Sequence, residues 1–139
     1  MTDTTTASGT IESKSWEHNE YAALATNGPS LAIAKGFDLY RGDLEGDADW
    51  QGLMITSADG SGTFDSVQRT RGTLGGRTGT FVLRMSGTFT ATGDSRADWS
   101  IVPGSGTGEL AGISGTGGYE SHAGESAYTL HYSCPEMCR

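Results

Sequence analysis

The sequence is poor in basic residues and has no long apolar run. Nine lysines and arginines stand against 17 acidic residues, and the formal net charge is −8. This argues against nucleic acid as a partner, because phosphate binding needs clustered Lys and Arg side chains. No apolar run approaches the roughly 18 residues of a membrane helix, and residues 1–6 lack the basic start and apolar middle of a signal peptide. We therefore expect a cytoplasmic protein with no membrane partner.

Cysteine is also scarce. The two cysteines, Cys134 and Cys138, stand close together near the C-terminus and could bind a metal or form a small disulfide. A structural zinc site needs four ligands, and no second Cys or His pair has a suitable spacing, since the histidines are scattered at His18, His122 and His131. We predict thiols of no special role, no metal site and no cofactor.

The common nucleotide-binding and hydrolase motifs are missing or fail in context. The sequence has no G-x-S-x-G, P-loop or H-E-x-x-H pattern. Residues 106–111 fit the dinucleotide fingerprint G-x-G-x-x-A, but that motif requires a helix that begins inside it. Four glycines within residues 112–118 exclude a helix there, because each is about 1 kcal/mol less favourable than Ala. We interpret the run as two short strands, 106–113 and 114–120, with glycine bends.

Glycine is the abundant residue, with 22 copies spread along the chain. A Gly-Thr-apolar triplet recurs at Gly9–Ile11, Gly62–Phe64, Gly72–Leu74, Gly79–Phe81 and Gly87–Phe89. Thr and Phe suit the pleated, half-buried surface of a strand, whereas glycine inside a strand marks bulges, bends and close approach of the backbone. The repetition predicts a curved sheet that closes on itself.

Apolar and polar residues alternate with the period of two that is typical of strands facing a core on one side. In residues 77–90 the odd positions include Phe81, Leu83, Met85 and Phe89, whereas the even positions are polar apart from Val82. Turn signals at 58–62 and 74–76 separate such segments at hairpin spacing.

These patterns predict an all-β fold, a single antiparallel eight-stranded β-barrel. The 139 residues suit one domain, with a core at about 8–133 and a flexible tail at 1–7. Only residues 17–24 have enough helix formers for a turn or two of helix. The expected strands lie near 8–16, 31–40, 43–55, 62–73, 77–90, 97–103, 107–119 and 126–133.

Several polar side chains are expected on the outer face of the barrel. Four acidic residues share one strand face: Asp43, Glu45, Asp47 and Asp49. Alternate residues of a strand stand more than about 6 Å apart, too far for all four to bind one cation. We interpret them as a solvated face, on which Glu45 could pair with Arg69 or Arg71 across strands. His131 alternates with Tyr132 and is expected to face outward as well.

A small-molecule site is predicted inside the barrel. The inner face of residues 63–73 carries one aromatic and three polar side chains: Phe64, Ser66, Gln68 and Thr70. The walls expected beside them are Trp50, Met85 and Trp99. A mostly apolar cavity with few polar groups is typical of a ligand site, and eight-stranded barrels either hold one ligand or fill with side chains. A fully hydrogen-bonded polar core is the alternative interpretation of the same residues.

Four segments carry a further signal: Lys14–Glu17, Tyr40–Gly46, Gln68–Arg69 with Gly72–Leu83, and Trp99–Gly112. In this order they resemble a bacterial family catalogued as domain of unknown function 3224, whose members are similar to the allene-oxide-cyclase barrel. The resemblance spans roughly residues 8–133. It implies an eight-stranded, lipocalin-like barrel that commonly self-associates, so we expect a homodimer. It supplies no settled activity.

The resemblance also implies two departures at inward-facing positions. Glu commonly stands in the family where this chain has Gln68, and His where it has Met85. If these two groups form an acid–base pair in relatives, this chain lacks it, because Gln orients by hydrogen bonding but does not shuttle a proton. The pocket is then more neutral and more apolar.

The first functional hypothesis is a cofactor-independent cyclase or isomerase. It would fold a flexible, apolar, natural-product-like molecule inside the cavity and control its ring closure or rearrangement, an entropy trap that can supply several kcal/mol. Gln68 would orient a carbonyl or hydroxyl, and Tyr128 or Tyr132 would donate a proton or hydrogen bond. The substrate-binding residues would be Trp50, Phe64, Phe81, Met85, Trp99 and Glu109.

Two other hypotheses use the same barrel. A non-catalytic, lipocalin-like carrier of an apolar metabolite needs the cavity without a reactive arrangement. A filled barrel that acts through its surface needs no cavity at all. The role of Glu109 is also open, because it could face the cavity or brace the glycine-rich bends.

Overall fold

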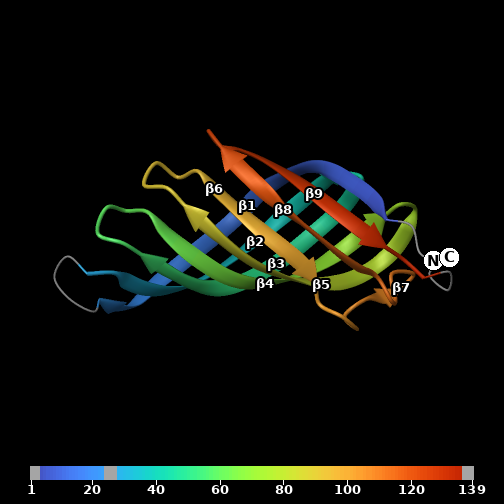
Figure 1. Ribbon diagram of the computed structural model, residues 1–139, viewed down its shortest axis with the longest axis horizontal. Coiled ribbons are helices and arrows are strands. Elements are labelled where there is room, and N and C mark those ends of the chain that lie inside the picture. The colour runs from blue at the N-terminus through green and yellow to red at the C-terminus, as the bar shows by residue number, and fades with distance from the viewer. Residues whose placement is uncertain (1–3, 24–27, 136–139) are drawn as a thin grey trace.

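The computed structural model describes residues 4–23 and 28–135, which form strands and turns with no helix. The strands are β1 (Thr5–Ala23), β2 (Ser30–Gly42), β3 (Leu44–Thr56), β4 (Gly62–Leu74), β5 (Arg77–Phe89), β6 (Ser95–Ile101), β7 (Thr107–Gly108), β8 (Ser114–His122) and β9 (Glu125–Ser133). All pairings between them are antiparallel, and the sheet order is β4-β3-β2-β1-β9-β8-β6-β5-β7 with β4 also paired to β5. Within the described residues, eight longer strands therefore close into a barrel, with the short β7 beside β5 (Figure 1). The predicted antiparallel eight-stranded β-barrel is confirmed.

Side chains alternate between the inside and the outside of the barrel, as the period of two predicts. On β5, Phe81, Leu83 and Met85 are 0%, 1% and 7% exposed, whereas Arg84 between them is exposed. On β4, Gln68 is 2% exposed and Thr70 is fully buried. The inner face assigned to both strands from the sequence is therefore confirmed.

The two ends of the barrel differ in how they are filled. The β2–β3 and β4–β5 connections and β7 lie together at one end (Figure 1). Large apolar side chains pack the interior there: Leu44, Leu74, Phe81, Leu110, Ile113 and Tyr132. The β3–β4, β5–β6 and β8–β9 turns lie at the other end, where a cavity takes the place of packed side chains.

The glycine-rich run closes the packed end. Only Thr107–Gly108 is extended in residues 106–113, so the strand predicted there is wrong for most of its length, whereas the one predicted at 114–120 is confirmed as β8. Tight turns at Gly108 and Gly112, with φ of +63° and +83°, instead bury the side chains of Leu110 and Ile113. Tertiary packing of these two residues favours turns over a continuous strand.

Two predictions about the N-terminal region are wrong. Residues 17–23 are not helical but continue β1, with Glu17 opposite Lys35 of β2; residue 24 lies outside the described residues. Residues 5–7 are not a tail, because β1 begins at Thr5, and Ala7 is paired with Leu130 and only 1% exposed. Pairing of residues 17–23 with β2 outweighs their weak local helix propensity.

A β-bulge interrupts β1. Ser13 is opposite Asp38 and Ser15 is opposite Phe37, so Lys14 is an extra residue between them. The extra residue reverses the alternation along the strand. Trp16 therefore faces the same interior as Ser13, which an uninterrupted strand would not allow.

The outer face of β3 and β4 carries the acidic residues as predicted, but in a different pairing. Asp47 contacts Arg71 at 2.7 Å, and Asp49 contacts Arg71 at 2.9 Å and Arg69 at 3.1 Å. Glu45 is opposite Thr73, and its carboxylate accepts a hydrogen bond from the Gly42 N–H at 2.6 Å. In this register both arginines form ion pairs with the aspartates, and the pairing predicted for Glu45 is wrong.

Three smaller features complete the fold. His131 is exposed, as predicted, and its Nδ1 lies 3.0 Å from the Thr6 hydroxyl. Cys134 packs against the core, whereas Cys138 lies outside the described residues. In the part of the chain that the structure describes, no helix is long and apolar enough to span a membrane. The homodimer stays a prediction.

Candidate functional site

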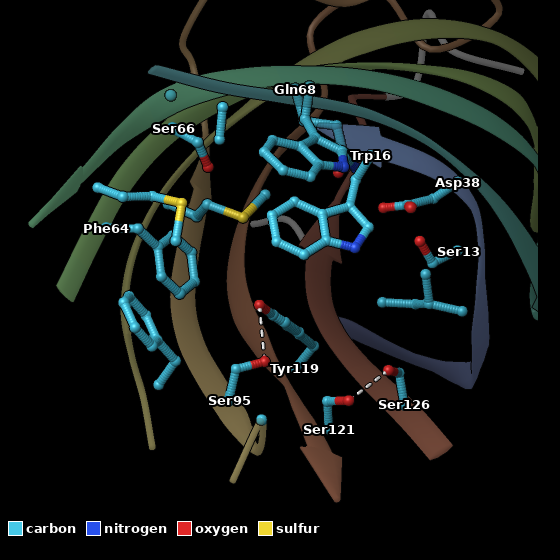
Figure 2. Close-up of a pocket in the computed structure, with 18 of the residues that line it drawn as sticks. Ser13, Trp16, Asp38, Phe64, Ser66, Gln68, Ser95, Tyr119, Ser121 and Ser126 are labelled. Atoms are coloured by element: carbon cyan, nitrogen blue, oxygen red, sulfur yellow. Dashed lines mark hydrogen bonds between the residues drawn. The ribbon is translucent and has the colours of Figure 1, made fainter. Parts of the chain in front are cut away.

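The candidate site is a cavity of about 360 Å³ inside the barrel. Its apolar lining includes Ile11, Trp16, Ala34, Trp50, Met54, Phe64, Met85 and Phe89. Its polar lining consists of Ser13, Asp38, Tyr40, Ser66, Gln68, Ser95, Tyr119, Ser121 and Ser126 (Figure 2). A largely apolar wall with a few polar groups is the composition expected of a small-molecule site.

Asp38 is the charged group of the cavity among the described lining residues. It lies on β2 opposite Ser13, and Figure 2 shows both side chains beside the Trp16 ring. Removal from water raises the pKa of the Asp38 carboxyl to about 6, and a hydrogen bond from the Trp50 indole opposes the rise. The carboxyl therefore titrates close to neutral pH.

Gln68 and Tyr40 form the polar floor of the cavity. The Gln68 amide Nε2 donates to the Tyr40 hydroxyl at 2.8 Å and to the Thr70 hydroxyl at 3.2 Å. Because the Tyr40 oxygen accepts from Gln68, its own O–H is free to donate elsewhere. Burial raises the pKa of Tyr40, so this hydroxyl stays protonated and acts as a donor.

The opposite wall holds a second phenol and a row of serines. The Tyr119 hydroxyl lies 3.3 Å from the Ser95 hydroxyl, and Ser126 donates to Ser121 at 2.9 Å (Figure 2). The Tyr119 ring stacks on Trp99, with centroids 6.1 Å apart. Burial raises the pKa of Tyr119, so it too is a donor near neutral pH.

Two tryptophans flank a glycine on the inner wall. Gly36 of β2 is opposite Trp16 on one side and Trp50 on the other. A Cβ at Gly36 would stand 2.6 Å from atoms of the Trp50 ring, so the indole lies directly over the bare backbone. Trp16 is 54% exposed, and its ring is accessible from solvent.

The structure brings together four of the nine residues predicted for the site. These are Trp50, Phe64, Gln68 and Met85. Phe81 and Trp99 do not line the cavity but belong to the packed core, at 0% and 5% exposure. Glu109 is exposed and accepts a hydrogen bond from the Thr78 N–H at 3.0 Å, so it braces the glycine-rich turns.

The two tyrosines predicted as proton donors also lie outside the cavity lining. The Tyr128 hydroxyl accepts from the Leu44 N–H at 2.9 Å and donates to the Arg41 carbonyl at 3.0 Å, which holds the β2–β3 turn. Tyr132 is in the core at the packed end, and its hydroxyl lies near Gly75 of the β4–β5 turn. Both predicted roles in donating to a ligand of this cavity are therefore wrong.

Sequence reasoning missed Asp38, Tyr40, Tyr119 and Trp16. On β2 the residues that face inward are the smaller or more polar set, and the exposed Ile33 faces outward. Apolar patterning alone therefore favours the wrong face. A usable signal was the alternation of Gly36, Asp38 and Tyr40, since glycine inside a strand indicates a close approach.

The described residues contain no group of three or more His, Cys, Asp or Glu side chains placed to hold a metal ion. The chemistry that these residues offer consists of one carboxyl that titrates near neutral pH, two phenol donors and an amide, inside an aromatic wall.

Comparisons with known proteins agree with the fold. The family described as "protein of unknown function (DUF3224)" matches residues 7–132. The chain is similar to a protein of unknown function from the same family in Shewanella oneidensis MR-1, whose crystal structure gives a TM-score of 0.76 at 27% sequence identity. The match covers 96% of this chain and 99% of that chain. No curated protein matches. The chain therefore belongs to the DUF3224 family.

Proposed function

We propose that the protein is a cofactor-independent isomerase or cyclase that acts on a largely apolar small molecule held in the cavity. The observation that carries this proposal is Asp38, a half-buried carboxyl whose pKa of about 6 lies close to neutral. Perturbed carboxyls in clefts are often catalytic acids or bases. Asp38, on β2, would supply an acid–base group that this chain lacks at Gln68 and Met85.

The roles of the polar groups follow from their protonation. Asp38 is ionised in most molecules above its pKa and accepts a proton from the bound molecule, then returns it at another position. Tyr40 and Tyr119 keep their protons and stabilise negative charge that develops on a substrate oxygen. Gln68 touches Tyr40 and fixes the direction in which that phenol donates.

The apolar wall supplies the second part of the catalysis. Trp16, Trp50, Phe64 and Met85 surround a volume of about 360 Å³, enough to hold a flexible molecule in a folded conformation. Such confinement lowers the entropy that ring closure must lose, and it can supply several kcal/mol.

A carrier function is the second candidate. The Gln68 amide is already hydrogen-bonded to Tyr40 and Thr70 within the protein, so this network can shape the cavity without contacting a ligand. The same apolar wall would then retain a metabolite without converting it.

The experiment that separates these functions is solvent extraction of the purified protein followed by mass spectrometry. Any retained metabolite is then incubated with wild type, with Asp38→Asn and with Asp98→Asn, which removes an exposed aspartate from β6. We expect a product of unchanged mass and altered retention time with wild type and Asp98→Asn only. Retention without conversion would favour the carrier. If the protein neither retains nor converts a metabolite, both functions are contradicted.

A further inference from the structure

The charge distribution in the cavity selects among ligand classes. Among the described residues that line it, Asp38 is the only one with a formal charge, and no Lys, Arg or His is present. A carboxylate or phosphate ligand would therefore meet a like charge with no basic partner. A cationic ligand would gain an ion pair in a partly desolvated setting, where such pairs are stronger than in water. The net charge of −8 adds attraction for cations.

The aromatic groups around Asp38 point to the same class. Trp50 donates a hydrogen bond to the Asp38 carboxyl, so its indole is in direct contact with that group. Trp16 is opposite Gly36, two residues from Asp38 on the same inner face, and Figure 2 shows its ring beside the carboxyl. Faces of tryptophan attract cations within about 6 Å of the ring centroid, and aromatic walls are a general means of binding ammonium groups.

We propose that the cavity binds an amine in its protonated form, with the ammonium group paired to Asp38 beside Trp16 and Trp50 and the apolar body of the ligand toward Phe64 and Met85. The inference rests on the proposed function, because it names the substrate class of the same cavity. The carboxylate that pairs with the nitrogen is also the group that accepts a proton in that proposal.

The pH dependence follows from the groups that face Asp38. These are Tyr40 on β2, Tyr119 on β8, and the neutral Trp50 and Ser13 on the flanking strands. Both phenols stay protonated because burial raises their pKa, so only the carboxyl changes its charge between acid and neutral pH. Amine binding should therefore strengthen as the pH rises through about 6.

The test uses three probes of one shape: phenylpropylamine, phenylpropanol and phenylpropanoate. Calorimetry gives their dissociation constants at about pH 8 and about pH 4.5, where a primary amine with a pKa near 10 is protonated throughout. We expect the amine to bind wild type roughly tenfold or more tightly than the alcohol at the higher pH, as a charge-assisted contact predicts. The preference should shrink at the lower pH. It should vanish in Asp38→Asn and persist in the matched exposed variant Asp98→Asn.

The outcomes separate this inference from the proposed function. Binding of the alcohol or carboxylate as tightly as the amine would overturn the inference and leave the small-molecule cavity standing. An amine preference that survives in Asp38→Asn would also overturn it. If none of the three probes binds, both the inference and the proposed cavity function are contradicted. Circular dichroism of Asp38→Asn confirms that the variant is folded before binding is measured.

Discussion

Replacing Asp38 by Asn should stabilise the protein in a pH-dependent way. The carboxyl has a pKa of 3.8 in an unfolded chain and about 6 in the folded protein. Well below pH 3.8 both states hold the proton, and the residue contributes nothing to the pH dependence of stability. Between these two pKa values the unfolded chain loses its proton first. Stability of the wild type therefore falls as the pH rises through this window, and the full penalty persists above it.

The size of the effect follows from the shift. A difference of about two pKa units corresponds to about 3 kcal/mol at neutral pH. Because the side chain is only half-buried, solvent screening reduces this, and we expect about 2 kcal/mol. Asn cannot ionise, but its amide oxygen can still accept the hydrogen bond from Trp50. The variant should therefore be more stable than wild type by about 2 kcal/mol near pH 8, or roughly 6 °C in Tm, and about equal to it below about pH 3.

The assay is urea unfolding followed by tryptophan fluorescence at a series of pH values, with Asp98→Asn as the control for lost net charge. A ¹³C NMR titration of the Asp38 carboxyl measures its pKa directly. A stability difference that does not change between acid and neutral pH would refute the reasoning, as would a variant less stable than wild type near pH 8. Either result would mean that the Asp38 carboxyl is not desolvated in the folded protein.

Two further substitutions test the site and its frame. Gly36→Ala places a methyl group 2.6 Å from Trp50 and should therefore displace the indole. We expect a shifted tryptophan emission and a fold destabilised by about 1–3 kcal/mol. An unchanged emission spectrum would contradict the packing of Trp50 on this glycine. Tyr128→Phe leaves the buried N–H of Leu44 without its hydroxyl partner and should lower the free energy of unfolding by about 1–3 kcal/mol in urea, with probe binding in the cavity unchanged. Loss of probe binding in that variant would show that Tyr128 takes part in ligand binding.

The sequence by itself determined the fold class and much of one wall of the cavity. Alternate side chains of a barrel strand point inward. Once the apolar positions of a strand are assigned to the inside, the inward direction of Gln68 and Met85 therefore follows from their odd or even place in the strand. The same pattern indicated the outward direction of Asp47 and Asp49. The recurring glycines predicted curvature because only a residue without a side chain permits the close backbone contacts of a small barrel.

Tertiary structure decided the chemistry of the site. The bulge at Lys14 turns Trp16 inward. No local sequence pattern predicts this extra residue, because its position depends on the pairing of β1 with β2. Asp38 faces the interior because register places it opposite Ser13, although apolar patterning favoured the other face of that strand. Its raised pKa arises from desolvation by burial in the folded barrel. Burial and register are properties of the closed barrel, so the local sequence of each strand does not contain them.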